Sequence, residues 1–232
     1  MRVSVHIADV GARSLVRVMR GQPRPGEFEG LRSIDVAVAA PLRASSLPSP
    51  QPGRVAMLAF WDDDAAIDRF ESSHPVASML ADGWSVRLEA LRRWGSWPGL
   101  DESVPTDRAT PHDGTAVVVT LARTRMSQLP RFLRTSEKAE RAAVESPGLL
   151  WGTALARPPY FATVSVWDGT RSLSTYAYGR RDPRHAEAIE VDQGKPFHHL
   201  SAFIRFRPYR STGLLGGKNP QPIALLADTA TQ

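Results

Sequence analysis

Cysteine is absent from this chain of 232 residues. Without a thiol there can be no disulfide framework, thiolate zinc site, iron–sulfur cluster or cysteine nucleophile. Long apolar runs are also missing, because stretches such as Val117–Val119 are far shorter than the roughly 20 residues that span a bilayer. Asp9 falls where a signal peptide would need its apolar stretch. We therefore expect a soluble cytoplasmic protein with no integral membrane segment.

Lysine is scarce as well, since arginine supplies 26 of the 29 basic residues in a chain of formal net charge +5. The arginines are scattered among Asp and Glu, whereas nucleic-acid binding usually needs a concentrated basic stripe or a recognisable module. We expect no nucleic-acid partner. With 42% hydrophobic residues the chain can bury a sizeable core. A buried arginine in such a core would suit an anionic ligand such as a carboxylate or propionate.

A Trp-Asp pair ends two β-rich runs, at Trp61-Asp62 and at Trp167-Asp168. Each aspartate is expected to cap a helix, because its carboxylate can accept free N–H groups of the first turn. An aliphatic residue follows each tryptophan by six positions and an aromatic residue by nine, which is typical of the buried face of a helix. These residues are Ile67 and Phe70 in the first half, and Leu173 and Tyr176 in the second.

Each half is predicted as strand–helix–strand–strand–helix–strand, the ferredoxin-like arrangement. We expect an N-terminal repeat over 1–99, a linker over 100–113, a C-terminal repeat over 114–210 and an arm over 211–232. A four-stranded sheet has one face that its own helices leave uncovered, so the second repeat should cover the first. The predicted fold is α+β, with two tandem ferredoxin-like repeats forming a pseudo-dimeric α+β barrel. Two such domains side by side are the alternative.

The histidines are the main candidates for catalysis or metal binding. The sequence contains no His-x-x-x-His or His-Glu-x-x-His helix for zinc, no paired-aspartate loop for calcium, no Gly-x-Ser-x-Gly nucleophile elbow and no dinucleotide-binding fingerprint. Asp182 is expected as a helix N-cap and Pro183 as the first helical residue, which puts His185 in the first turn. A helix N-terminus disfavours imidazolium, so this ring stays neutral and can donate a lone pair. An exposed first-turn histidine is an equal alternative.

The sequence gives weaker support for a functional role of the other histidines. His198 and His199 are adjacent in the last expected strand and therefore point to opposite faces. His198 is expected on a core-like stripe, and His199 on a mixed stripe that could line a polar-tipped pocket. His6 and His112 are expected to be structural or solvated, and His74 to cap a helix.

Several stretches together match the pattern of a known family. They are the strand end Ser165–Asp168, the helix through Tyr176, residues 183–189 (Pro-Arg-His-Ala-Glu-Ala-Ile) and residues 197–206 (Phe-His-His-Leu-Ser-Ala-Phe-Ile-Arg-Phe), with Phe60-Trp61-Asp62 and Pro75-Val76 at the equivalent places of the first half. In these stretches the chain resembles the spheroidene monooxygenase family of carotenoid ketolases. The resemblance covers most of residues 1–208.

The resemblance implies a barrel protein that binds haem b and uses dioxygen or peroxide to oxidise a hydrophobic or secondary-metabolite molecule. His185 matches the family's Pro-x-His-Ala histidine and is the expected iron ligand. Arg184 and Arg205 are expected to hold the cofactor through its propionates, and Tyr176 and His199 to act as catalytic groups beside it. The implied partners are a small hydrophobic substrate and an electron-donor protein, for a monomer or a homodimer.

Other functions stay open. Iron that binds a nitrogen or oxygen of the substrate would allow dehydration or N-functional chemistry. A cofactor-free oxygenase of the same architecture would need only a pocket and a base such as His199 or His185. A small-molecule carrier that is no enzyme would use these histidines for packing.

Overall fold

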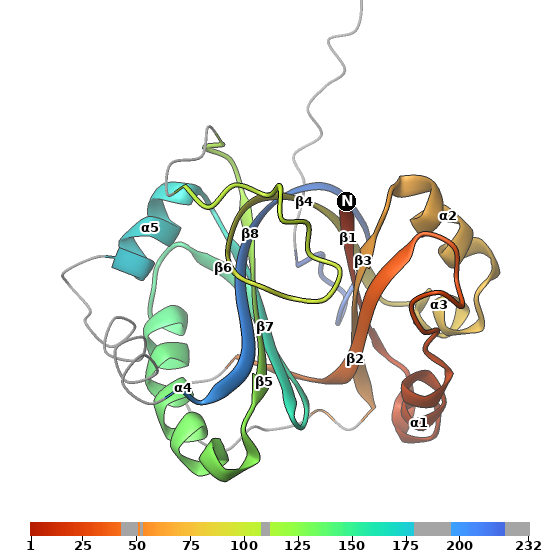
Figure 1. Cartoon of the computed structure of the whole chain (residues 1–232), viewed down its shortest axis with the longest axis horizontal. Coiled ribbons are helices and arrows are strands. Elements are labelled where there is room, and N and C mark those ends of the chain that lie inside the picture. Colours follow the sequence, from red (N-terminus) through yellow and green to blue (C-terminus); the bar gives the residue numbers. More distant parts are fainter. Residues whose placement is uncertain (43–50, 52, 108–111, 179–195, 221–232) are drawn as a thin grey trace, which may run out of the picture.

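Eight antiparallel strands close into a barrel in the computed structural model of this chain (Figure 1). The structure describes residues 1–42, 51, 53–107, 112–178 and 196–220. The strand order round the barrel is β1-β3-β2-β6-β7-β5-β8-β4. The first four strands thus form an arc in the order β4-β1-β3-β2, and the last four form an arc in the matching order β8-β5-β7-β6. An α+β fold built on a closed barrel is confirmed.

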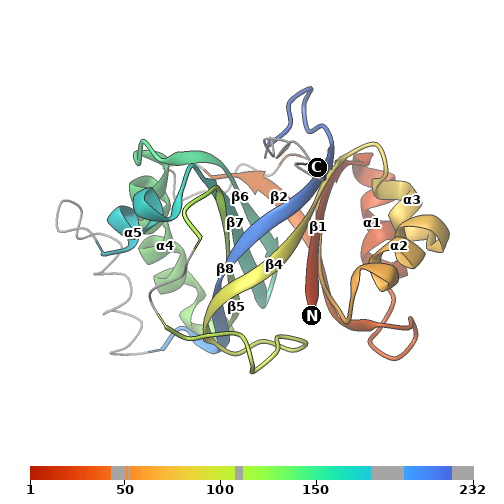
Figure 2. The same ribbon diagram turned by 90° about the horizontal axis from the view of Figure 1, so that it is seen from above.

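Helices cover the outside of each arc, α1 to α3 on one side of the barrel and α4 and α5 on the opposite side (Figure 2). The first half consists of β1 (Arg2–Asp9), α1 (Gly11–Gly21), β2 (Leu31–Pro41), β3 (Arg54–Trp61), α2 (Asp64–Ser73), α3 (Pro75–Leu80) and β4 (Trp84–Gly95). The second half consists of β5 (Ala116–Thr124), the 3-10 turn η1 (Met126–Gln128), α4 (Leu129–Val144), β6 (Leu149–Arg157), β7 (Tyr160–Trp167), α5 (Thr170–Tyr178) and β8 (His198–Gly213).

Two hydrogen-bonded seams join the arcs. β2 pairs with β6 from Val38 to Pro41, and β4 pairs with β8 from Trp84 to Gly95. Two ferredoxin-like domains lying side by side would have neither seam, so that alternative is wrong. The second seam includes Gly213, which pairs with Trp84. The first residues of the expected arm over 211–232 therefore belong to the barrel, because β8 continues past residue 210.

The inside of the barrel is packed with side chains. Inward positions alternate along each strand, and Val3, Val5 and Ile7 of β1 are all 0% exposed. Trp84 of β4 is also fully buried, and its indole Nε1 donates to Ser211 Oγ at 2.9 Å. Because the interior is filled, a ligand has to bind outside the barrel or at one of its ends.

The first helix cap lies one residue later than expected. The carboxylate of Asp63, not that of Asp62, accepts the Ala66 N–H at 2.9 Å and caps α2. Asp62 follows the last residue of β3 and donates its own N–H to Gly30 O at 2.8 Å. In the second half α5 begins at Thr170, two residues after Asp168. The Trp-Asp pattern therefore marks the strand end rather than the capping residue.

Candidate functional site

The helix layer of the first half is packed closely onto its strands. Val55, Met57, Ala59 and Trp61 of β3 point outward beneath the helices, and each is 0% exposed. They form one buried cluster with side chains of all three helices. This side of the barrel is a second hydrophobic core, in which the helices cover the outward side chains of β3 completely.

The matching side of the second half is only partly covered. Thr120 of β5 is exposed, and the register places it opposite Thr163 of β7 and Phe203 of β8, which are both half-buried. Trp94 of β4 lies opposite Phe203 and is 54% exposed. Because cross-strand partners share a face, these residues form one row. We call the row the outer face of the second half: Trp94, Phe203, Thr120, Thr163 and Ala154.

The helices above this outer face are buried only in part. In α4 the buried residues are Ala142 and Ala143 near its end, whereas Phe132 and Leu133 near its start are half-buried. From α5, Leu173 joins the small buried cluster beneath the helices. Apolar surface therefore remains accessible both on the strands and on the helices that cover them.

Two buried arginines lie beside the outer face of the second half. Arg92 of β4 pairs with Arg205 of β8 in the strand register, and the two residues are 7% and 3% exposed. Arg92 Nε donates to the backbone oxygen of Thr106 at 3.1 Å. The sequence predicted Arg205 as a ligand-binding residue but missed Arg92. A β-bulge between Ala90 and Arg92 turns Arg92 to the outer side, and a regular alternation gives no sign of it.

Tyr176 holds the two helices of this layer together. Its ring stacks on Trp167 with centroids 4.9 Å apart. Its hydroxyl donates to the backbone oxygen of Ala139 in α4 at 3.2 Å. This bond uses the hydroxyl proton within the fold, so the structure gives Tyr176 a packing role, and its catalytic role stays a prediction.

A second β-bulge changes the sides of the two adjacent histidines. The register of β8 against β5 shifts between His198 and Leu200, so His199 is the extra residue. The expected core position of His198 is therefore wrong. Its ring instead meets Phe132 of α4 edge-on, with centroids 5.3 Å apart. His199 is exposed, as a surface group rather than the lining of a closed pocket.

The other described histidines have structural surroundings. His74 Nδ1 accepts an N–H of the first turn of α3, which confirms the expected cap, and burial lowers the pKa of its ring. His112 Nε2 lies 2.9 Å from Thr115 O. His6 is buried against α2, where desolvation and the nearby Arg87 lower its pKa to about 4.

His185, the expected iron ligand, and Arg184 lie outside the described residues. In the part of the chain that the structure describes, no group of three or more His, Asp or Glu side chains could hold a metal ion. A haem needs as little as one axial side chain, so its fit depends on the surroundings. The outer face of the second half combines small and aromatic side chains with the buried Arg92 and Arg205. These residues fit a planar apolar group that carries two carboxylates.

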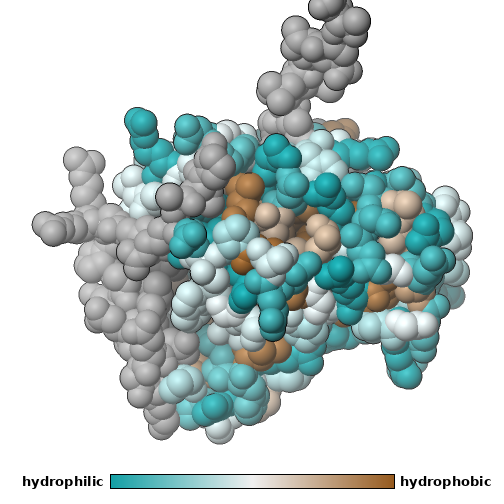
Figure 3. Space-filling view, turned by 45° about the horizontal axis from the view of Figure 1, so that its top comes forward, coloured by the Kyte–Doolittle hydropathy of each residue, from teal (hydrophilic) through white to brown (hydrophobic). Residues whose placement is uncertain are grey.

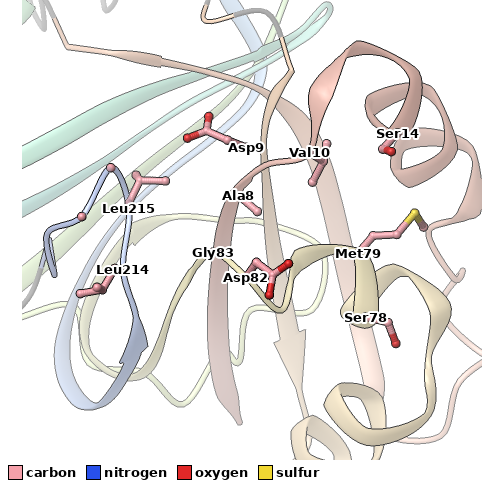
Figure 4. Close-up of a pocket in the computed structure, with 12 residues that line it drawn as sticks. Ala8, Asp9, Val10, Ser14, Ser78, Met79, Asp82, Gly83, Leu214 and Leu215 are labelled. Atoms are coloured by element: carbon pink, nitrogen blue, oxygen red, sulfur yellow. The ribbon is translucent and has the colours of Figure 1, made fainter.

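A separate cavity of about 510 Å³ lies between the end of β1, α3 and the turn after β8 (Figure 4). Its charged lining residues are Asp9 and Asp82. Both carboxylate oxygens of Asp9 already accept hydrogen bonds from Arg54 at 2.7 Å. The described lining holds no histidine, tyrosine or arginine.

The face of the molecule seen in Figure 3 is mainly hydrophilic and is interrupted by small apolar patches. Among the described helices, none is long and apolar enough to cross a membrane.

No protein-family model matches this sequence, and no curated protein matches it. Among solved structures the chain is similar to an aldoxime dehydratase, with 10% identity and a TM-score of 0.53 over 89% of this chain and 80% of that one. It is also similar to a candidate monooxygenase from Fusobacterium nucleatum, with 9% identity and a TM-score of 0.41 over 91% and 94% of the two chains. The first similarity shows a shared fold, and the second is too weak to carry an argument.

Proposed function

We propose that this chain is a haem-dependent oxidative enzyme whose haem binds between the sheet and the helices of the second half. The observation that carries the proposal is the difference between the two helix layers. The first is sealed, whereas the second leaves the outer face of the second half partly accessible beside Arg92 and Arg205. The matching strand orders also support two tandem ferredoxin-like repeats that form a pseudo-dimer.

The family resemblance supplies the role of His185 as the iron ligand. Arg92 and Arg205 hold the propionates by charge-assisted hydrogen bonds, and Arg184 is a further partner. His199, at the exposed end of β8, moves protons between solvent and substrate. When bound, haem supplies the activation of dioxygen or peroxide. The substrate is a small hydrophobic molecule, and a monooxygenase reaction with dioxygen also requires an electron donor.

Absorption spectra of the purified protein during a titration with hemin test this proposal. We expect a sharp Soret band that saturates at one haem per chain. The band should weaken or shift in His185→Ala and stay unchanged in the control variant His112→Ala. No specific band at saturating hemin would remove haem from the proposal. Full haem content with an unchanged spectrum in His185→Ala would remove His185 as the ligand.

Dehydration is the second candidate reaction, since the solved structure that shares the fold is named for it. An aldoxime loses one water to become a nitrile, with no net change in electrons. Haem-loaded protein that converts an aliphatic aldoxime without oxygen would favour dehydration. Product formation that depends on oxygen and a donor would favour the monooxygenase. Turnover by haem-free protein would instead identify a cofactor-free enzyme.

A further inference from the structure

A second pocket lies at the turn between β6 and β7, away from the outer face of the second half. Its volume is about 240 Å³. The register pairs Tyr160 with both Arg123 and Arg157, so these three side chains share one side of the sheet. Tyr160 belongs to the core inside the barrel, which places the pocket at an end of the barrel interior. We call it the β6–β7 turn pocket: Asp35, Arg123, Arg157, Pro158, Pro159 and Tyr160.

The hydroxyl of Tyr160 is buried and unpaired at this pocket. Tyr160 is 3% exposed, and its hydroxyl has no hydrogen-bond partner among the described residues. A buried polar group left unpaired is unfavourable, so a molecule that accepts this hydrogen bond would be favoured. Burial and the nearby Asp35 raise the pKa of Tyr160, which keeps the hydroxyl protonated and able to donate.

Two cations and one anion surround the same space. Asp35 Oδ1 lies 3.7 Å from a guanidinium nitrogen of Arg123 and 3.7 Å from one of Arg157, too far for good hydrogen bonds. The other carboxylate oxygen of Asp35 accepts from Trp97 Nε1 at 3.2 Å. In the described part of the chain neither guanidinium group makes a hydrogen bond, so both have N–H groups to offer. The formal charge of the pocket is +1 with Asp35 ionised.

We propose that the β6–β7 turn pocket binds a small organic monocarboxylate. The carboxylate accepts from the guanidinium groups of Arg123 and Arg157, whose planar forks match its geometry, and from the hydroxyl of Tyr160. One negative charge balances the formal charge of the pocket, whereas a doubly charged phosphate would leave one negative charge uncompensated in a partly buried site. The two prolines of the turn give the apolar body of the ligand a wall to pack against.

Calorimetric titration of the full-length protein with benzoate tests the proposal, with benzyl alcohol as an uncharged probe of the same shape. We expect saturable one-to-one binding of benzoate and no binding of the alcohol. Arg123→Gln and Arg157→Gln should each weaken binding about tenfold. Tyr160→Phe, which removes only the hydroxyl, should weaken it about 3–10-fold. The control Arg17→Gln changes an exposed arginine of α1 and should leave binding unchanged.

Asp35→Asn tests the sign of the charge that the pocket accepts. Removing the carboxylate should tighten benzoate binding by at least about threefold, because a repulsive charge is lost. Weaker binding in this variant, equal binding of benzoate and benzyl alcohol, or no saturable binding would each overturn the proposal. Thermal melts of every variant confirm that it folds. The titration is run with and without hemin, so its outcome is separate from that of the haem proposal.

Discussion

Tyr176 of α5 stacks on Trp167 at the end of β7, with ring centroids 4.9 Å apart. Phe70 of α2 packs on Trp61 at the equivalent place at the end of β3, with the rings tilted and their centroids 5.2 Å apart. The shared spacing of nine residues is therefore a packing unit in which a strand-end indole lies beneath a helix aromatic. In the second half the helix aromatic is a tyrosine, and its hydroxyl donates a hydrogen bond to the backbone oxygen of Ala139 in the neighbouring helix α4.

Tyr176→Phe separates the packing role of this residue from a catalytic one. The ring and its stacking remain, and one partly buried hydrogen bond is lost. We expect the free energy of unfolding to fall by about 0.5–1.5 kcal/mol, with haem content and turnover unchanged. Urea unfolding measures the first quantity and hemin titration the second. Loss of turnover with haem content intact would instead support the catalytic role.

Arg92 and Arg205 should each contribute to the affinity for haem. Arg205→Gln and Arg92→Gln each remove one cation beside the outer face of the second half. We expect each to weaken hemin binding about tenfold or more, because a hydrogen bond to a charged group contributes about 1.5–3 kcal/mol. The Soret band gives the affinity. Arg205→Lys keeps the charge and should retain part of the affinity, whereas a loss equal to that of Arg205→Gln would contradict a charge-based role.

The order of the elements could be predicted from the sequence because its signals are local. Alternating apolar residues mark strands such as β1, and the Trp-Asp pairs mark matching strand ends. The bulges beside Arg92 and at His199 could not be predicted, since each depends on how a distant strand pairs. One extra residue reverses the side on which the neighbouring side chains lie. This is why His198 was expected on the wrong side and Arg92 was missed.

The β6–β7 turn pocket was missed for a different reason. Asp35, Arg123 and Arg157 are isolated charged residues in three strands, and nothing near any of them in the sequence suggests a site. Their relation arises from barrel closure, which brings β2 into register with β6. Trp97 joins them from the chain after β4, where its indole bonds to Asp35. A polar cluster of this kind shows itself only when strands distant in sequence meet.

Asp35→Asn should stabilise the protein at neutral pH. Burial raises the pKa of Asp35 above its usual value of 3.8, more than Arg123, Trp97 and Arg157 lower it. The folded state therefore binds a proton more readily than the unfolded chain, and the charged carboxylate reduces stability once the pH lies above the raised pKa. Thermal melts should show a higher melting temperature for the variant at pH 7. The difference should shrink as the pH falls towards 3.8, and an advantage that grows in acid would contradict this account.

His6 should make the protein sensitive to mild acid. Its pKa falls from 6.5 to about 4 in the folded state, because the ring is buried and lies near Arg87. Between these two values the unfolded chain binds a proton that the folded chain excludes, so stability falls as the pH drops from 6.5 towards 4. This group alone contributes a slope of up to about 1.4 kcal/mol per pH unit.

His6→Gln removes that titration while keeping a polar side chain beside Glu71, which lies 3.8 Å from the imidazole Nε2. Urea midpoints measured at intervals from pH 7 to pH 4.5 should therefore fall less steeply for the variant than for the wild type. His112→Gln, which changes a histidine of the linker, is the matched control and should follow the wild-type slope. Other carboxylates titrate in all three proteins, so the decisive quantity is the difference between the slopes. Parallel curves for wild type and His6→Gln would show that His6 is protonated in the folded state.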